Sequence, residues 1–126
     1  MGKAYEEWLH QADYDMDTAE FMLAGGRCFY AVFMCHLAVE KAIKGLFQRK
    51  LDRVPPKVHH LTQLLSATGC EAPPEIAKFL VRLNEANVAT RHPEDIRTLT
   101  SVYDETVAGT MIDQGKEAIR WIKSQF

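Results

Sequence analysis

Apolar residues recur every three or four positions along most of the chain, which is the spacing of an amphipathic α-helix. No alternating apolar–polar segment of useful length competes with this pattern, so β-strands are not expected. The pattern predicts helices over residues 4–23, 27–50, 60–67, 73–88 and 103–123. The sequence therefore predicts an all-α fold, an up-and-down four-helix bundle with one additional short helix.

Glycine and proline residues mark the ends of these helices. The sequence AGG at 24–26 is expected to end the first helix, and the prolines at 55–56 cannot continue the second. The prolines at 73–74 suit a first helical turn, where no backbone donor is needed. The segment 87–103, NVATRHPEDIRTLTSVY, is rich in Thr and Ser and contains Pro93, so we expect a loop there.

The helix predicted over residues 27–50 is apolar around most of its circumference. One face carries Val32, Cys35, Val39, Ile43 and Leu46, and a second sector carries Phe29, Phe33, Leu37 and Phe47. A helix that is apolar on most sides belongs in the middle of a bundle.

Length and composition indicate one compact domain that spans residues 1–126, with 47% hydrophobic and 25% charged residues. The net charge of −2 argues against indiscriminate binding to a phosphate backbone but leaves room for a local basic patch. Cys28 and Cys35 lie two helical turns apart, too far for a disulfide, and Cys70 makes the count odd. We therefore expect reduced thiols and a cytoplasmic protein without a membrane span.

The sequence lacks the spacings of common catalytic and metal-binding motifs. It has no C-x-x-C or H-E-x-x-H pair, no phosphate-binding glycine loop and no serine in a nucleophile elbow. We therefore predict no metal site and no cofactor, and find little support for nucleophilic catalysis.

Polar residues interrupt the apolar second helix at His36, Glu40 and Lys44, which lie four apart and share one face, with Lys41 beside them. The simplest interpretation is a helix-surface ion pair between Glu40 and Lys44, worth about 0.3–0.5 kcal/mol. The alternative is that Lys41 and Lys44 face a cleft and meet an anionic ligand or the acidic surface of a partner.

Two further segments contain candidate residues. Arg91 is a fixed cation next to His92, which titrates near neutral pH. Arg91 either serves a ligand or caps a helix end or bridges to the acidic flank of the first helix. The second segment is KVHHL, residues 57–61, in which His59 or His60 is expected to cap the short helix. We expect the two histidines to position the loop and not to bind a metal.

The order of these features resembles the HEPN family of small helical domains. The resemblance covers EEWLHQADYDMDTAEFML (6–23), CFYAVFMCHLAVEKAIKGLF (28–47), PPKVHHLTQLL (55–65), RHPED (91–95) and VYDETVAGTMIDQGKEAIRWI (102–122). Its most specific part is the pattern His-x-Ala-x-Glu-Lys-x-x-Lys in the second segment. The resemblance implies a helical bundle that forms a homodimer, partners a minimal nucleotidyltransferase of the toxin–antitoxin type and binds nucleotide or RNA.

The resemblance also assigns recurrent polar positions to residues of this chain, namely Asp13, Glu40, Lys41, Lys44, His60, Arg91 and Tyr103. The predicted nucleotide-binding residues are Lys41, Lys44 and Arg91 at the phosphates and Tyr103 stacked on a base. The predicted polar network consists of Asp13, His36, Glu40 and His60.

Many branches of the family are ribonucleases that use an Arg-x(4–6)-His motif at the start of the last long helix. That motif is absent at the expected position here, so we assign no catalytic residue. Arg91 and His92 are the candidates for the alternative, a ribonuclease toxin. A third interpretation is a structural network of Glu40, Lys44 and Arg91 that fixes helix register and dimer geometry.

Two aromatic residues, Tyr14 and Phe21, lie seven positions apart on the far side of the first helix. They are either candidate interface residues or isolated surface aromatics.

Overall fold

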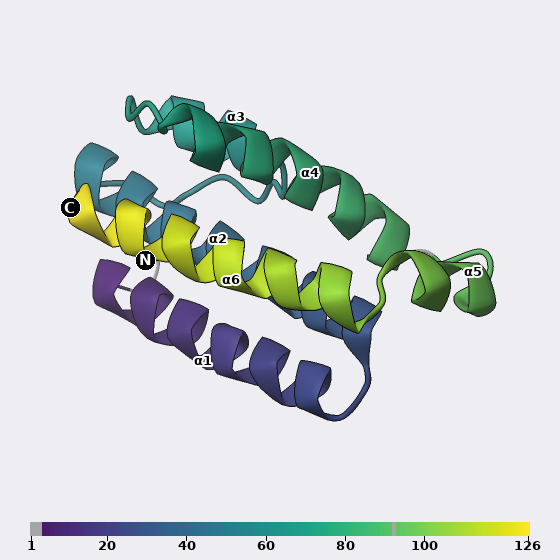
Figure 1. Ribbon diagram of the computed structural model, residues 1–126. Helices are drawn as coiled ribbons and strands as arrows, with labels where there is room; N and C mark the ends of the chain where they lie inside the picture. Colours follow the sequence, from purple (N-terminus) through teal and green to yellow (C-terminus); the bar gives the residue numbers. More distant parts are fainter. Residues whose placement is uncertain (1–3, 92) are drawn as a thin grey trace.

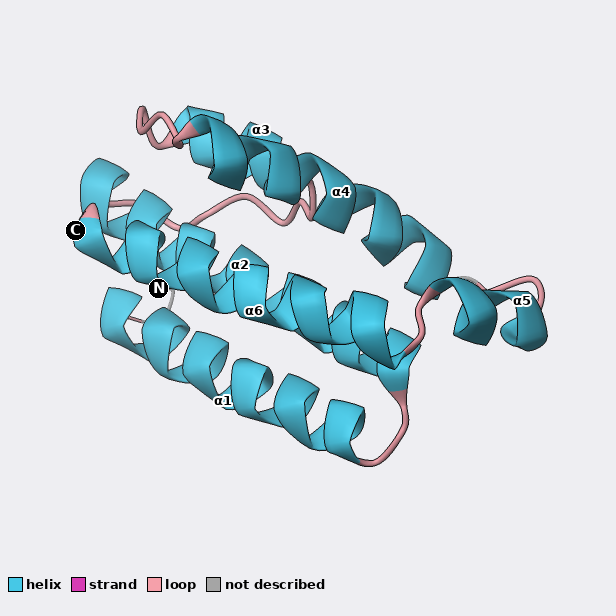
Figure 2. Cartoon of the chain, in the orientation of Figure 1, coloured by secondary structure: helices cyan, strands magenta, loops and turns pink. Residues whose placement is uncertain are grey.

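The computed structural model describes residues 4–91 and 93–126, and every regular element within them is an α-helix (Figure 1, Figure 2). The helices are α1 (Tyr5–Ala24), α2 (Cys28–Leu51), α3 (Leu61–Ala67), α4 (Pro74–Arg91), α5 (Ile96–Val102) and α6 (Glu105–Ser124). The four long helices form the bundle, α3 packs beside α4, and α5 projects at one end (Figure 1). The predicted all-α four-helix bundle is confirmed, with one more short helix than expected.

The centre of the bundle is α2, which contacts each of the other five described helices. Its predicted apolar face, Val32, Cys35, Val39, Ile43 and Leu46, is completely buried. Buried residues that join it in the core are Ala12, Met16 and Ala19 of α1, Phe79, Leu80 and Leu83 of α4, and Ile112, Ala118 and Ile122 of α6. Burying a side chain of Val, Leu, Ile or Phe contributes about 1.5–3 kcal/mol, so this shared core holds the helices together.

Two glycines allow the long helices to approach closely. At Gly45 of α2, a Cβ atom would lie 3.1 Å from Trp8 Cβ and 3.3 Å from the Tyr5 carbonyl oxygen, both on α1. At Gly115 of α6, a Cβ atom would collide with Cys35 Sγ. Gly115 therefore leaves no room for a side chain, and Gly45 lies in tight contact with α1.

The loop expected over residues 87–103 is mostly helical, and that prediction is wrong. α4 continues to Arg91, and α5 forms within the segment. Asp95 caps α5, because its side chain accepts hydrogen bonds from the backbone N–H groups two and three residues later, at 2.9 and 3.3 Å. Leu99 is the buried residue of this short helix. Polar composition alone does not distinguish a loop from a short, capped helix.

The remaining helix boundaries lie within two residues of those expected. The first helix ends at AGG as predicted, and Gly26 adopts φ +79°, a backbone conformation that suits glycine. None of the helices in the described part of the chain combines the length and the apolar character needed to cross a membrane.

All three cysteines are free thiols. Cys35 is completely buried, and burial raises the pKa of its thiol to about 12, which makes it a poor nucleophile. Cys28 and Cys70 are half-buried.

Candidate functional site

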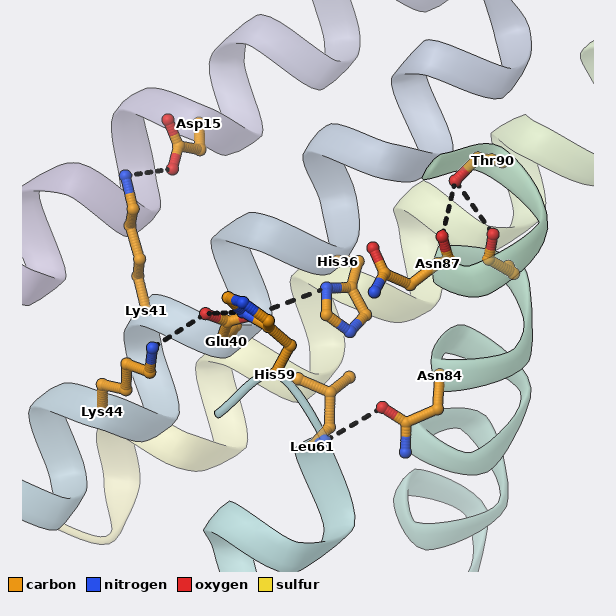
Figure 3. Close-up of polar contacts among 11 residues, drawn as sticks. Asp15, His36, Glu40, Lys41, Lys44, His59, Leu61, Asn84, Asn87 and Thr90 are labelled. Atoms are coloured by element: carbon orange, nitrogen blue, oxygen red, sulfur yellow. Dashed lines mark hydrogen bonds and ion pairs between the residues drawn. The ribbon is translucent and has the colours of Figure 1, made fainter. Parts of the chain in front are cut away.

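The polar strip of α2 lies inside the protein. His36, Glu40 and Lys44 are only 2%, 3% and 7% exposed. Lys44 Nζ lies 2.9 Å from Glu40 Oε2, and His36 Nδ1 lies 3.7 Å from Glu40 Oε1 (Figure 3). The ion pair between Glu40 and Lys44 is therefore a buried one, in which loss of either partner would leave an uncompensated charge.

A histidine from the connection between α2 and α3 completes this cluster. His59 Nδ1 lies 3.1 Å from each carboxylate oxygen of Glu40, and its side chain is half exposed (Figure 3). In the same connection, Pro55 is buried. Glu40 is thus the common partner of a lysine and two histidines.

His60, which was predicted for the polar network, lies elsewhere. It is exposed, and its Nδ1 accepts a hydrogen bond from Gln63 N at 3.3 Å, so it caps the short helix α3. Successive side chains of an extended segment point to opposite sides, so only one of the two histidines can face Glu40. The helix-capping role anticipated for this pair belongs to His60, and the network role belongs to His59.

The other wall of the site comes from α4. Asn84 Oδ1 accepts a hydrogen bond from Leu61 N at 2.9 Å, which joins α4 to the start of α3 (Figure 3). A cleft of about 330 Å³ opens here and is lined by His59, His60, Asn84, Glu85, Asn87 and Val88. Its volume lies at the lower end of the range for small-molecule sites. Neither asparagine was predicted, because an isolated asparagine in a helical segment carries no motif signal.

The electrostatic environment keeps His36 neutral. Burial lowers the pKa of His36 to about 4; the Glu40 carboxylate and the Asn84 side chain oppose this shift, and His59 and Arg91 add to it. Nδ1 faces Glu40 at 3.7 Å, beyond hydrogen-bond distance, and Nε2 is completely buried.

Arg91 is the last residue of α4 and is exposed. Its guanidinium carbon lies 5.7 Å from the centre of the Phe33 ring, a cation–π distance. Arg91 follows Asn84 and Asn87 at helical spacing, so it lies beyond them on the same side of α4. His92 lies outside the described residues, and the predicted pairing of Arg91 with His92 stays a prediction.

Lys41 faces α1 instead of Glu40. Its Nζ lies 2.8 Å from Oδ2 of Asp15, a residue that is itself 7% exposed (Figure 3). Asp15 was not predicted, although its position three residues after the buried Ala12 places it near the inner face of α1. Asp13, which was predicted for the network, is instead part of an exposed ion pair in which Lys123 Nζ lies 2.9 Å from its carboxylate.

Tyr103 lies in a different groove, between α4 and α6. This groove has a volume of about 370 Å³ and is lined by Arg82, Glu85, Ala86, Tyr103, Thr106, Val107, Thr110, Met111 and Gln114. Burial raises the pKa of the Tyr103 hydroxyl, and the Glu85 carboxylate adds to this shift. The four predicted nucleotide-binding residues therefore do not converge on one pocket.

Together, the fold and the site define a small all-α domain whose central helix buries a His–Glu–Lys cluster beside a polar cleft. The chain belongs to the HEPN family, because the family model described as HEPN domain matches residues 5–125. The resemblance inferred from the sequence is thereby confirmed.

Two solved structures share this architecture. One is described as an archaeal HEPN homologue, ST0689, with a TM-score of 0.81 and 25% identity over 98% of both chains. The other is TT1696 from Thermus thermophilus, with a TM-score of 0.84 and 21% identity over 97% of this chain and 98% of the other. The second comparison supports the fold alone. Among curated proteins, none matches the chain.

Proposed function

We propose that this HEPN domain protein is a binding module that forms a homodimer, partners a minimal nucleotidyltransferase of the toxin–antitoxin type and contributes to nucleotide binding. The observation that supports nucleotide binding best is the cleft between His59 and α4, with an exposed arginine beyond its asparagines. Concave sites with a few convergent polar groups are the usual form of small-molecule sites.

The arrangement along α4 suits the two ends of a nucleotide. In this proposal a planar base lies in the cleft lined by Asn84 and Asn87, since carboxamides donate and accept hydrogen bonds. Arg91 lies about one helical turn further on, roughly 5.4 Å along the axis, where its guanidinium is free of any carboxylate among the described ion pairs. We therefore propose Arg91 as the direct phosphate contact.

The two lysines have an indirect role in this proposal. Lys41 and Lys44 are each held by a carboxylate, Asp15 and Glu40 respectively, so part of their charge is already neutralised. Lys41 joins α2 to α1 through Asp15. Lys44 holds the carboxylate of Glu40, which contacts His59 at the cleft.

The proposal is non-catalytic because Glu40, the buried carboxylate of the site, is fully engaged by its neighbours. RNA cleavage needs a base and a cation beside the reacting 2′-hydroxyl and phosphate. Arg91 and His92 are the residues for that alternative. If the purified protein cleaves labelled RNA and His92→Ala does not, the protein is a ribonuclease and the binding-module proposal is wrong.

Isothermal titration of the full chain with ATP and GTP tests the nucleotide-binding proposal. Arg91→Ala should weaken binding about 10- to 100-fold, because a charge-assisted hydrogen bond is worth about 1.5–3 kcal/mol. Arg49→Ala is the matched control, since Arg49 is also exposed and lies 5.7 Å from the Tyr5 ring, away from the cleft. It should leave affinity unchanged.

Equal weakening by Arg49→Ala and Arg91→Ala would show a general charge effect and not a phosphate contact. If neither nucleotide produces heat, with or without a co-expressed small nucleotidyltransferase, the nucleotide-binding part of the proposal fails.

A further inference from the structure

The outer face of α1 carries both an exposed aromatic side chain and a hollow. Phe21 is 75% exposed, more than any other large hydrophobic residue in the described part of the chain. A hollow of about 440 Å³ opens beside the first half of the same helix and is lined by four residues from Glu7 to Tyr14, with Asp15 and Lys41. Figure 1 shows α1 at the edge of the bundle, packed against α2 and α6. The face with Phe21 and the hollow is therefore open to another molecule.

The residues that line the hollow have the spacing of a helix-packing site. The four from Glu7 to Tyr14 follow the pattern i, i+3, i+4 and i+7. In coiled coils, four residues of one helix form a hole that receives one side chain, the knob, of the facing helix. Phe21 lies seven residues after Tyr14, about two turns further on the same side of α1. The centre of the hollow is about 16 Å from Phe21 along the helix axis, so a phenylalanine that fills it comes from another molecule.

The walls of the hollow suit an uncharged aromatic ring. Lys41 Nζ lies 2.8 Å from Asp15 Oδ2, so the charges of these two residues already have partners. Tyr14 borders the hollow and is 73% exposed, which leaves its ring available for packing against a second ring. The hollow therefore needs no charged ligand.

A second copy of the chain brings a phenylalanine to each hollow. When two α1 helices lie antiparallel about a two-fold axis near residues 15–16, residue 21 of each lies opposite residues 10–11 of the other, at the centre of the hollow. The same register places Tyr14 opposite Asp17 of the second copy. Asp17 is exposed and belongs to none of the described ion pairs, so its carboxylate is available to accept a hydrogen bond from the Tyr14 hydroxyl.

Two acidic residues at the side of this face are neutralised within each chain. Asp13 pairs with Lys123 at 2.9 Å, and Glu20 pairs with Lys116 at 3.0 Å. Like charges that meet across an interface weaken it, and a two-fold interface brings the same face of both copies together. The two lysines of α6 remove much of that repulsion.

We propose that the homodimer forms by antiparallel pairing of α1, with Phe21 of each protomer seated in the hollow of the other. This inference rests on the homodimer of the proposed function and specifies its interface. Two phenylalanines fill two hollows at once, so the interface is closed and gives a dimer instead of a filament.

Two variants break this contact from opposite sides. Phe21→Ala removes the ring and keeps the hollow, whereas Gln11→Trp fills the hollow and keeps Phe21. The homodimer of either variant lacks both contacts. Burial of one aromatic ring is worth about tenfold or more in affinity, so analytical ultracentrifugation should give each variant a dissociation constant at least about 100-fold above wild type.

A mixture of the two variants is the decisive measurement. Their heterodimer keeps one intact contact, in which Phe21 of the Gln11→Trp chain enters the hollow of the Phe21→Ala chain. With one variant fluorescently labelled, the heterodimer should form at least about tenfold more tightly than either homodimer. Tyr30→Ala and Gln63→Trp are the matched controls, because both residues are exposed and lie on α2 and α3. Both controls should dimerise like wild type.

Two results would overturn the α1 pairing and leave the homodimer intact. One is a wild-type dimer that persists in both variants, and the other is a mixture that associates no more tightly than its components. A monomeric wild type would overturn the homodimer and this inference together. If Gln11→Trp does not fold, Glu7→Trp fills the same hollow from an exposed position, and the same comparison applies.

Discussion

Burial changes the chemistry of His36 more than that of any other candidate in the site. A solvated histidine is half protonated near pH 6.5, yet this ring is 2% exposed and has a pKa of about 4. The opposing pull of Glu40, 3.7 Å away, does not overcome the loss of hydration. His36 therefore acts as a neutral hydrogen-bonding group at physiological pH.

This shift makes stability depend on pH. Because the pKa is about 4 in the folded protein and 6.5 in the reference state, the unfolded chain takes up the proton first as pH falls. Stability from neutral His36 is complete above about pH 6.5 and is lost progressively down to about pH 4, on the order of 3 kcal/mol in total. Urea denaturation of wild type and His36→Gln at pH 7, 5.5 and 4.5 measures this loss.

His36→Gln should lose much less stability over that pH range than wild type, since it has no proton to take up at this position. The exposed His10→Gln is the control and should follow the wild-type curve. If His36→Gln and wild type lose the same stability at low pH, His36 is not the source of the pH dependence.

At the scale of the helices, α6 packs against α2 and α1 through a position with no room for a side chain. Gly115 lies against Cys35 of α2 and Met16 of α1, and both neighbours belong to the buried core. Gly109, on the same helix, has only Leu23 Cδ2 near it, at 3.9 Å from an added Cβ. Replacing these two glycines with alanine should therefore have opposite effects on stability.

Gly115→Ala should destabilise the protein by about 1–3 kcal/mol, because the added methyl group overpacks the core. Gly109→Ala should stabilise it by about 0.5–1 kcal/mol, since alanine is the better helix former and space is available. Thermal unfolding of the two variants beside wild type gives the comparison. The double variant Cys35→Ala with Gly115→Ala should recover part of the loss, and a stable Gly115→Ala single variant would refute the packing account.

At the scale of the whole molecule, three aromatic side chains in the described part of the chain are exposed to solvent, and the two most exposed lie on one helix. Tyr14 and Phe21 of α1 are 73% and 75% exposed, which agrees with their expected place on the outer side of that helix. Exposed aromatic residues are enriched at protein interfaces. We therefore propose that this face of α1 contributes to the homodimer.

Light scattering should then give a mass near twice that of the 14.3 kDa chain. The double variant Tyr14→Ser with Phe21→Ser should give a monomer that remains folded, because neither side chain belongs to the core. Val54→Ser, at an exposed loop residue, should stay dimeric. If the wild-type protein is a monomer, the proposed homodimer is wrong. If the double variant remains a dimer, the interface lies on another face of the protein.

The periodicity of apolar residues was sufficient to predict much of the fold, because amphipathic spacing depends only on neighbours along the chain. It identified the long helices, the central place of α2 and its buried face of Val32, Cys35 and Val39. The spacing of His36, Glu40 and Lys44 also identified a shared polar strip and the resemblance to the HEPN family.

The sequence by itself thus determined the four long helices and α3, the family and the strip of polar residues on α2, but not α5. Only the tertiary structure decided that this strip is buried, that His59 rather than His60 meets Glu40, and that Asp15 holds Lys41. It also placed Asn84 and Asn87 across the cleft from His59. These contacts join segments far apart along the chain, so they depend on how the helices pack against one another, which local periodicity does not encode.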